Sequence, residues 1–487
     1  MLVVLISILI RVVPTLYTNN VFSNDSWPLL HASNYVLLHP NEKIFSLSRE
    51  FEHHVLYPVA IVESALYVLI TGTSVDVFYK LVGVVLLTLA MALSAYILAK
   101  YLSYSYKASI LSTLALTLVP WFTTYTSAYL KEFYAHALLL LLIYVVAKMR
   151  KPCGGFLALL LIISTALVFS HPLTTLMAVA ILASWFFVNL VHFALWRHRL
   201  TVSYSMAIAS VTVLLMHLVH SLVLAREFVV INAEDVAMLV LYAGGIYGCY
   251  VLLGKASSIL IVPAFVLSTI AILKVITVPL AYTAFFFIAP PVLLLSMGSE
   301  DISGDSDASR LATSALLVVA VIFVFISTYM AELLSVLHRV LNYVIYAAVP
   351  VAALLAERYG RLWSILSGVL LALSILVAIT VAAGANPYTF YWRYTDHDTM
   401  LTAFLEEHTE LSVFGDPKYS QASRAVNSIP VHVLRNLCTF GEGALVASRD
   451  DLKYGVPLSP VDFFKLDDSV LLCRSRVFDS GYVYVFA

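Results

Sequence analysis

The sequence predicts a polytopic α-helical membrane protein with about 13 transmembrane helices and a small extracytoplasmic α/β domain at its C-terminus. Hydrophobic residues make up 61% of the 487 residues and charged residues only 12%, with a mean hydropathy of +0.93. Soluble domains carry about 25% charged residues. The apolar stretches are each about 17–24 residues long, which is enough to cross a bilayer. From Asn386 onward the chain changes character and becomes charged, with only short apolar runs.

The apolar stretches define a predicted transmembrane module over residues 1–384. They lie at about 1–17, 76–99, 108–127, 130–147, 155–170, 173–195, 202–224, 236–253, 257–273, 276–297, 311–331, 337–356 and 362–384. We interpret the first as a retained anchor, because it has no charged leader and no small-residue cleavage site. The stretch Tyr57–Gly72 is shorter and contains Glu63, so we expect it to lie in the membrane interface.

The distribution of basic residues predicts the orientation. With the N-terminus inside, the inner loops hold eleven Lys and Arg residues, whereas the short outer loops hold only Lys131, Arg226, Lys274 and Arg339. This is the bias that the positive-inside rule describes, and it would reverse if 57–72 crossed the membrane. The first loop (18–75, with the interfacial helix 57–72) and the C-terminal domain (385–487) are therefore both predicted to face outward from the cell membrane.

The tail contains the signals of one small domain. A helix is predicted at Thr399–His408, and strands are predicted at Leu411–Phe414, Ala444–Ala447, Val470–Cys473 and Tyr482–Phe486. About 100 residues are enough for one α/β domain. Cys438 and Cys473 both lie in this tail, and the sequence leaves open whether they form a disulfide or remain two buried thiols. The net charge of −1 argues against a nucleic-acid partner.

Polar residues near the membrane are costly and by default mark a site or a paired structural contact. The predicted topology places several on the outer side, although they are distant in sequence: Asp25, Lys131, Glu132, His171, His338 and Arg339. We therefore predict that they line one outward polar cavity. Each has a simpler interpretation when taken alone. Asp25 can be a solvated residue or a helix cap, Lys131 can extend to the interface, and His171 can cap a helix.

These residue types fit sugar transfer from a lipid phosphate. The planar fork of an arginine matches phosphate oxygens, which suits Arg339, supported by Lys131 or His171. Inverting transfer needs one base toward the acceptor, and Asp25 would suffice. Glu132 can orient the acceptor or share a divalent cation, Mg²⁺ or Mn²⁺, with Asp25. A metal site of these two carboxylates alone would be weak, because hard cations prefer about six oxygen ligands.

Several short motifs carry a family resemblance. They are Arg11-Val-Val-Pro14, Asp25-Ser26-Trp27-Pro28, Lys131-Glu132, His171-Pro172 and His338-Arg339-Val-Leu-Asn-Tyr. In these motifs and in its whole layout the chain resembles GT-C glycosyltransferases, and more narrowly archaeal proteins related to protein mannosyltransferases and oligosaccharyltransferase catalytic subunits. The resemblance implies a polyprenyl-phosphate-linked sugar donor and an extracytoplasmic acceptor, which can be a protein, a lipid or a glycan. It also implies Asp25 as the acidic residue of the first outer loop and Arg339 near the lipid phosphate, with Trp27 and His338 as neighbouring substrate-binding residues.

The sequence departs from the family pattern at three points. The tail lacks the WWDxG motif, so transfer of N-glycans to sequons is not supported. The first loop has one Asp where protein mannosyltransferases have a paired Asp-Glu. Glu132 has no partner in a DxD or ExD pair, so the motif does not support a metal site.

Two other function classes remain open from the sequence. A transporter or lipid flippase explains the many spans and buried charges equally well, but explains less well the long first outer loop and the one-sided polar set. A membrane scaffold whose tail binds a cell-surface partner is the third interpretation. Substitution of Asp25 separates these classes, because only the enzyme requires its carboxylate for sugar transfer.

Overall fold

The structure is a computed structural model of the chain. It describes residues 2–18, 20–23, 25–47, 51, 54–103, 105–149, 154–196, 204–225, 233–254, 294–295, 298, 306–329 and 339–383, and within the tail 394–408, 413–415, 419, 431–433, 444–448, 451, 456–459, 462–464, 476–480 and 483–486.

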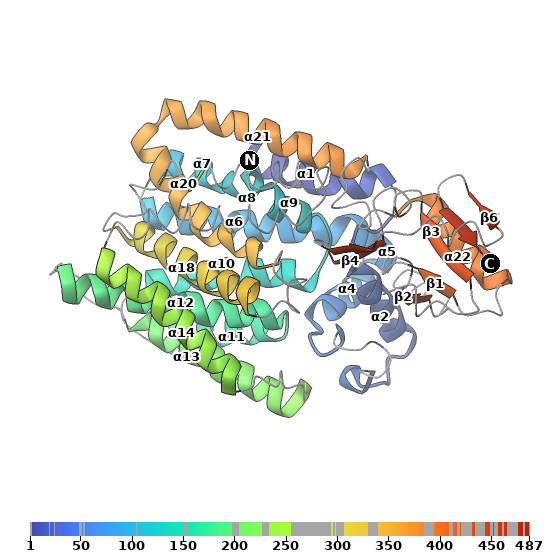
Figure 1. Ribbon diagram of the computed structural model, residues 1–487, viewed down its shortest axis with the longest axis horizontal. Coiled ribbons are helices and arrows are strands. Elements are labelled where there is room, and N and C mark those ends of the chain that lie inside the picture. Colours follow the sequence, from blue (N-terminus) through green and yellow to red (C-terminus); the bar gives the residue numbers. More distant parts are fainter. Residues whose placement is uncertain are drawn as a thin grey trace.

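Helices build the larger part of the molecule and run mostly side by side along its long direction (Figure 1). In chain order they are α1 (Leu2–Thr18), α2 (Ser26–Leu38), η1 (Ile44–Leu47), α4 (Val59–Thr71), α5 (Val75–Val77), η3 (Phe78–Val82), α6 (Gly83–Ser103), α7 (Tyr106–Thr113), α8 (Ala115–Leu118), α9 (Pro120–Tyr125), α10 (Lys131–Lys148), α11 (Gly154–Val168), α12 (Pro172–Trp196), α13 (Ser205–Val219), η4 (His220–Ala225), α14 (Ala233–Leu253), α18 (Asp307–Thr328), η6 (Leu341–Val344), α20 (Ile345–Tyr359) and α21 (Arg361–Ala382).

Seven helical segments in the described part of the chain are long and apolar enough to cross a membrane. They are Val75–Ser103, Pro172–Leu195, Ser205–Leu224, Glu234–Leu253, Asp307–Ile326, Leu341–Tyr359 and Arg361–Ala382. Each corresponds to one of the predicted spans, so the chain is a helical, multi-pass membrane protein. The predicted spans 257–273 and most of 276–297 lie outside the described residues, and the total of 13 stays a prediction.

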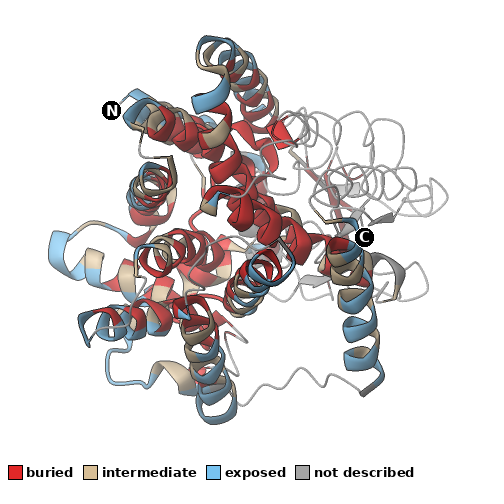
Figure 2. Cartoon of the chain, turned by 90° about the vertical axis from the view of Figure 1, so that its left-hand side faces the viewer, coloured by how far each residue is buried: buried red, intermediate tan, exposed pale blue. Residues whose placement is uncertain are grey.

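The outer helices expose apolar side chains. Figure 2 shows buried residues gathered inside the bundle and exposed residues on the outward faces of the peripheral helices. On α21, Leu362, Ile365 and Val369 are exposed, whereas Trp363 and Leu370 are buried. An exposed apolar stripe at helical spacing would be unfavourable in water, and it is what a helix presents to lipid.

The predicted span 108–127 is broken into three short helices, α7, α8 and α9. Pro120 begins α9 and has no backbone N–H to continue the helix that precedes it. The buried Arg11 of α1 donates to the carbonyl oxygen of Leu116 at 2.7 Å and to the hydroxyl of Thr126 at 2.8 Å. The guanidinium therefore satisfies a carbonyl group near this interruption.

The first loop folds into helices at one end of the bundle. The predicted interfacial helix 57–72 is α4, which ends at Gly72 with φ of 70°, a left-handed cap that favours glycine. The face of α4 that contains Ala60, Ile61 and Ala65 is buried, and α4 packs against α2. The helix is thus present as predicted, and its position in the membrane interface stays a prediction.

The tail contains α22 (Asp396–His408) and the strands β1 (Val413–Gly415), β2 (Val431–Val433), β3 (Ala444–Ser448), β4 (Val456–Ser459), β5 (Asp462–Phe464), β6 (Arg476–Asp479) and β7 (Val483–Phe486). One sheet has the order β2-β1-β3-β7-β6. In it β1 pairs parallel with β2 and β3, and β7 pairs antiparallel with β3 and β6. A separate antiparallel pair joins β4 and β5. Figure 1 shows this sheet and α22 at the end of the bundle that also carries α2 and α4.

The prediction located α22, β1, β3 and β7 but missed the other strands. Leu401 and Leu405 of α22 pack against Val413, Val446 and Val485 and form a small separate core. The predicted strand Val470–Cys473 and both tail cysteines, Cys438 and Cys473, lie outside the described residues.

Candidate functional site

The predicted site residues in the described part of the chain lie at the amino ends of helices. Asp25 occupies the N-cap position of α2, Lys131 and Glu132 begin α10, His171 directly precedes α12, and Arg339 lies two residues before η6. Pro172 follows His171 as the first residue of α12, where its missing N–H has no cost. The first N–H groups of a helix have no partner within the helix and give this end a partial positive charge. His338 lies outside the described residues.

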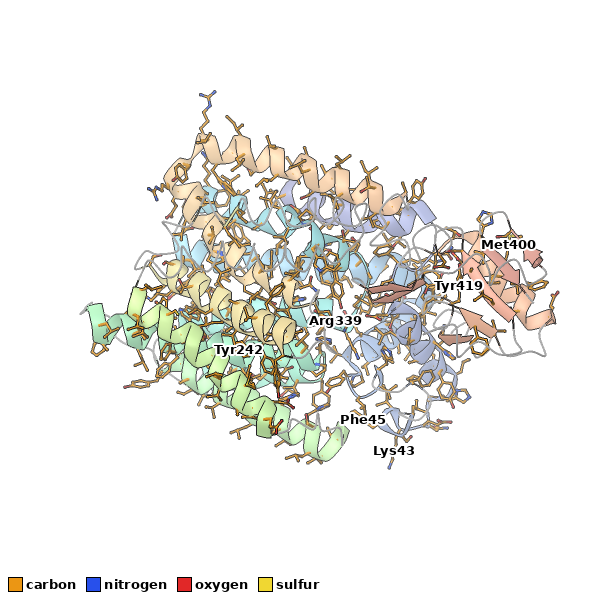
Figure 3. The ribbon with its side chains drawn as sticks, in the orientation of Figure 1. Lys43, Phe45, Tyr242, Arg339, Met400 and Tyr419 are labelled. Atoms are coloured by element: carbon orange, nitrogen blue, oxygen red, sulfur yellow. The ribbon has the colours of Figure 1, made fainter. Side chains whose placement is uncertain are left out.

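Arg339 connects the two carboxylates predicted as catalytic. Its Nη2 donates to Oδ2 of Asp25 at 2.9 Å, and its Nη1 lies 3.9 Å from Oε2 of Glu132. Figure 3 places Arg339 where the helix bundle meets the helices of the first loop. Arg339 lies shortly before α20, and its guanidinium therefore links a residue of the first loop, Asp25, to a residue of α10, Glu132.

The two carboxylates differ in accessibility. The Asp25 side chain is 44% exposed, whereas that of Glu132 is 1% exposed. Asp25 occupies the N-cap position of α2 but makes no side-chain capping hydrogen bond. Its carboxylate pairs with Arg339 instead, so the capping interpretation does not describe its contact. Asp25 remains accessible to a substrate, and Glu132 does not.

Donors surround the buried Glu132. The Tyr125 hydroxyl donates to Oε2 at 2.6 Å, and the Asn342 side-chain amide donates to Oε1 at 3.4 Å. Nε2 of His136 lies 3.5 Å from Oε1, and Nε2 of His171 lies 3.6 Å from Oε2. A buried carboxylate is tolerated only when such partners replace its water. Glu132 is therefore the centre of a pre-organised polar cluster.

His171 is held in a defined orientation. The backbone N–H of Thr174 donates to its Nδ1 at 3.3 Å, and the Thr174 hydroxyl lies 3.0 Å from the same atom and 2.8 Å from the Tyr343 hydroxyl. Because Nδ1 accepts from the backbone, the ring proton belongs on Nε2, which faces Glu132. Burial lowers the pKa of His171 to about 3 despite the opposing effect of Glu132. At neutral pH His171 is a neutral donor.

The other two predicted substrate-binding residues lie beside this cluster. The Lys131 side chain is buried, and its Nζ lies 5.3 Å from the centre of the Tyr57 ring in a cation–π contact. The buried Trp27 ring lies 5.0 Å from the Tyr394 ring at the start of the tail. The Asn20 side-chain amide also donates a hydrogen bond to the backbone carbonyl oxygen of Tyr394 at 3.5 Å. The tail thus meets the first loop next to Asp25.

The sequence prediction missed three partners of Glu132: Tyr125, His136 and Asn342. The i, i+4 spacing of Glu132 and His136 on one helix is a signal that could have found one of them. Asn342 follows Arg339 by three residues, which is a weaker signal. No sequence pattern indicated Tyr125, because a helix end and a loop separate it from Glu132.

A second polar network braces the loop before α10. The Tyr129 hydroxyl donates to Glu63 of α4 at 2.6 Å, and the Ser26 hydroxyl donates to the Tyr129 carbonyl oxygen at 3.2 Å. The Tyr129 ring lies directly over Gly83, so closely that a Cβ there would be 2.3 Å from a ring carbon. Burial raises the pKa of Glu63 above its ordinary value and raises the pKa of Tyr129 well above its own. This network fixes the segment that carries Lys131 and Glu132.

The side chains of the cluster do not fit a divalent cation. In the part of the chain that the structure describes, no group of three or more His, Cys, Asp or Glu side chains is arranged to hold a metal ion. Both oxygens of Glu132 already face donors, and Arg339 lies between Glu132 and Asp25. A cation there would meet a positive group and too few free oxygens.

Comparison with known proteins identifies the fold. No protein-family model matches the sequence, and no curated protein matches it. The solved oligosaccharyltransferase of Archaeoglobus fulgidus, in its apo form, superposes with a TM-score of 0.54 at 10% identity, covering 92% of this chain and 69% of that one. The chain shares the fold of this oligosaccharyltransferase, which is the fold that the predicted resemblance to GT-C glycosyltransferases implies. The predicted resemblance is confirmed at this level.

A second structure of the same oligosaccharyltransferase, in complex with Zn and sulfate, gives a TM-score of 0.53 at 9% identity. The match covers 89% of this chain and 62% of the oligosaccharyltransferase, so this chain spans less than two thirds of that protein. ArnT from Cupriavidus metallidurans bound to undecaprenyl phosphate also matches, over 100% of this chain and 97% of its own, with a TM-score of 0.40 and 12% identity. The GT-C fold accounts for the helical bundle that positions the cluster.

Proposed function

We propose that the protein is an inverting glycosyltransferase that moves a sugar from a polyprenyl-phosphate-linked donor to an extracytoplasmic acceptor. The observation that carries the proposal is the Asp25–Arg339 pair, at 2.9 Å, which sets an accessible carboxylate beside a guanidinium at the rim of the bundle. The GT-C fold, shared with an oligosaccharyltransferase, supports the same reaction class. The nature of the acceptor, whether a protein, a lipid or a glycan, is left open.

The proposed chemistry divides between the two members of this pair. The acceptor oxygen attacks the anomeric carbon, its proton passes to the Asp25 carboxylate, and the bond from that carbon to the phosphate oxygen breaks. Arg339 binds the phosphate oxygens and stabilises the negative charge that the leaving group gains. Because attack and departure occur on opposite sides of the carbon, the donor is expected to separate Asp25 from Arg339.

Further groups support the leaving phosphate. Lys131 supplies a second positive charge near the cluster, and neutral His171 can donate a hydrogen bond without adding charge. The amino ends of α2, α10 and α12 add partial positive charge. Glu132 is assigned the role of holding Arg339, because its own oxygens are buried and engaged. Trp27 and Tyr394 connect the substrate side of the first loop to the tail.

The test is transfer of radiolabelled sugar from polyprenyl-phosphate donors to acceptors in membranes that carry the wild-type protein or Asp25→Asn. Loss of a general base is expected to reduce transfer by about 10²–10⁴-fold. The matched control is Asp76→Asn, because Asp76 pairs only with Lys80 at 2.6 Å on the surface in the contacts described. Asp76→Asn should transfer at the wild-type rate.

Two results would contradict the proposal. Undiminished transfer by Asp25→Asn would remove Asp25 from catalysis. Absence of transfer by the wild-type protein with every donor tested would reject the glycosyltransferase, and ion-coupled uptake or lipid translocation in vesicles would then be measured.

A further inference from the structure

The two carboxylates of the cluster are joined by one cationic side chain. Arg339 reaches Oδ2 of Asp25 at 2.9 Å with Nη2, and its Nη1 lies 3.9 Å from Oε2 of Glu132. Two carboxylates from distant parts of a chain can contribute ligands to a divalent-cation site, although a hard cation prefers about six oxygens. In this protein the positive centre belongs to the chain itself.

We propose that the Arg339 guanidinium occupies the position of a divalent cation between Asp25 and Glu132, and that the site works without a bound metal. This inference concerns the site of the proposed function and departs from the Mg²⁺ or Mn²⁺ that the sequence allowed.

The ligand chemistry of Glu132 supports the assignment. Its Oε2 accepts from Tyr125 at 2.6 Å, and its Oε1 is approached by Asn342 at 3.4 Å and by His136 at 3.5 Å. A metal–oxygen bond of about 2.0–2.6 Å would require these donors to move away. These donors are compatible with a neighbouring guanidinium, because the donors and the guanidinium both present N–H or O–H groups to the carboxylate oxygens.

The charge balance of the cluster points the same way. Asp25 and Glu132 contribute two negative charges, and Arg339 and Lys131 contribute two positive charges. His171 remains neutral. A divalent cation would add two further positive charges beside a fixed guanidinium. The donor phosphate, in contrast, is an anion that the same cations can bind.

The experiment measures Mn²⁺ binding to the purified full-length protein in detergent, by electron paramagnetic resonance of the free ion. The wild-type protein is expected to show no saturable Mn²⁺ binding that depends on Asp25. In Arg339→Met the two carboxylates lose their shared cation, so Mn²⁺ affinity should increase at least about tenfold. The gain should disappear in the double variant Arg339→Met, Asp25→Asn.

Three results would overturn the inference. The first is saturable Mn²⁺ binding to the wild-type protein that Asp25→Asn abolishes. The second is a correctly folded Arg339→Met variant that gains no Mn²⁺ affinity, because the carboxylates then form no cation position. If Arg339→Met does not fold, the comparison of wild type with Asp25→Asn decides alone. The third is sugar transfer by wild-type membranes that stops in EDTA and returns with Mn²⁺.

Mn²⁺ binding and sugar transfer are separate measurements, so the two proposals can fail separately. A protein that transfers no sugar but still gains Mn²⁺ affinity in Arg339→Met would reject the glycosyltransferase and retain the role of Arg339. Transfer that depends on Asp25 and resists EDTA is expected if both proposals hold.

Discussion

Glu132→Gln offers the most direct test of how the cluster is held together. The substitution keeps the size of the side chain and removes its charge. Glu132 is 1% exposed, and its strongest contact is the charge-assisted hydrogen bond from Tyr125 at 2.6 Å. Such a bond contributes about 1.5–3 kcal/mol. The contact with Arg339 at 3.9 Å adds less, because Arg339 is 30% exposed and keeps Asp25 as a partner.

We therefore expect Glu132→Gln to lower the free energy of unfolding by about 2–4 kcal/mol. Asp25→Asn is the matched control, because it removes the other carboxylate that pairs with Arg339. The Asp25 side chain, however, is 44% exposed. Pairs in such positions contribute about 0–1 kcal/mol. Tyr125→Phe, which removes one donor, should fall between the two.

The assay is reversible unfolding of the purified protein in mixed micelles by titration with SDS, followed by far-ultraviolet circular dichroism. The predicted order of stability is wild type, Asp25→Asn, Tyr125→Phe and Glu132→Gln. Equal stability of Glu132→Gln and wild type would refute the view of Glu132 as the centre of the cluster. A loss for Asp25→Asn as large as that for Glu132→Gln would show that Asp25 is a structural residue.

Two further predictions concern the surroundings of the cluster. Gly83→Ala should destabilise by about 1–3 kcal/mol, because its Cβ would lie 2.3 Å from the Tyr129 ring; Gly368→Ala, with open space at its Cβ, should not. The same SDS titration measures both, and an unchanged Gly83→Ala would show that the ring can move. The pKa of His171 is lowered from 6.5 to about 3 in the folded protein. Between these two pH values the unfolded chain binds a proton on this histidine and the folded protein does not. The free energy of unfolding should therefore fall as the pH drops below about 6.5. Comparison of wild type with His171→Gln at pH 7.5 and pH 5 checks this, and an equal loss in both would assign the effect to another group.

Much of the architecture could be predicted because it depends on local composition. A segment of about 20 apolar residues crosses a membrane wherever it lies in the chain, since its backbone groups bond within the helix. The helix at 57–72 was separable from the spans by its length and by Glu63. The same reasoning predicted that Asp25, Glu132, His171 and Arg339 share one side, and the structure brings these four into one cluster.

The contacts within the cluster were decided only by the tertiary structure. Asp25 and Arg339 are separated by 314 residues, and no local pattern specifies that one guanidinium reaches both carboxylates. Tyr125 reaches Glu132 across the end of α9, in the segment that the hydropathy had indicated as one continuous span. Hydrophobicity determines which segments enter the membrane, and the pairing of buried polar groups depends on how those segments pack, because each donor must find an acceptor that water no longer supplies.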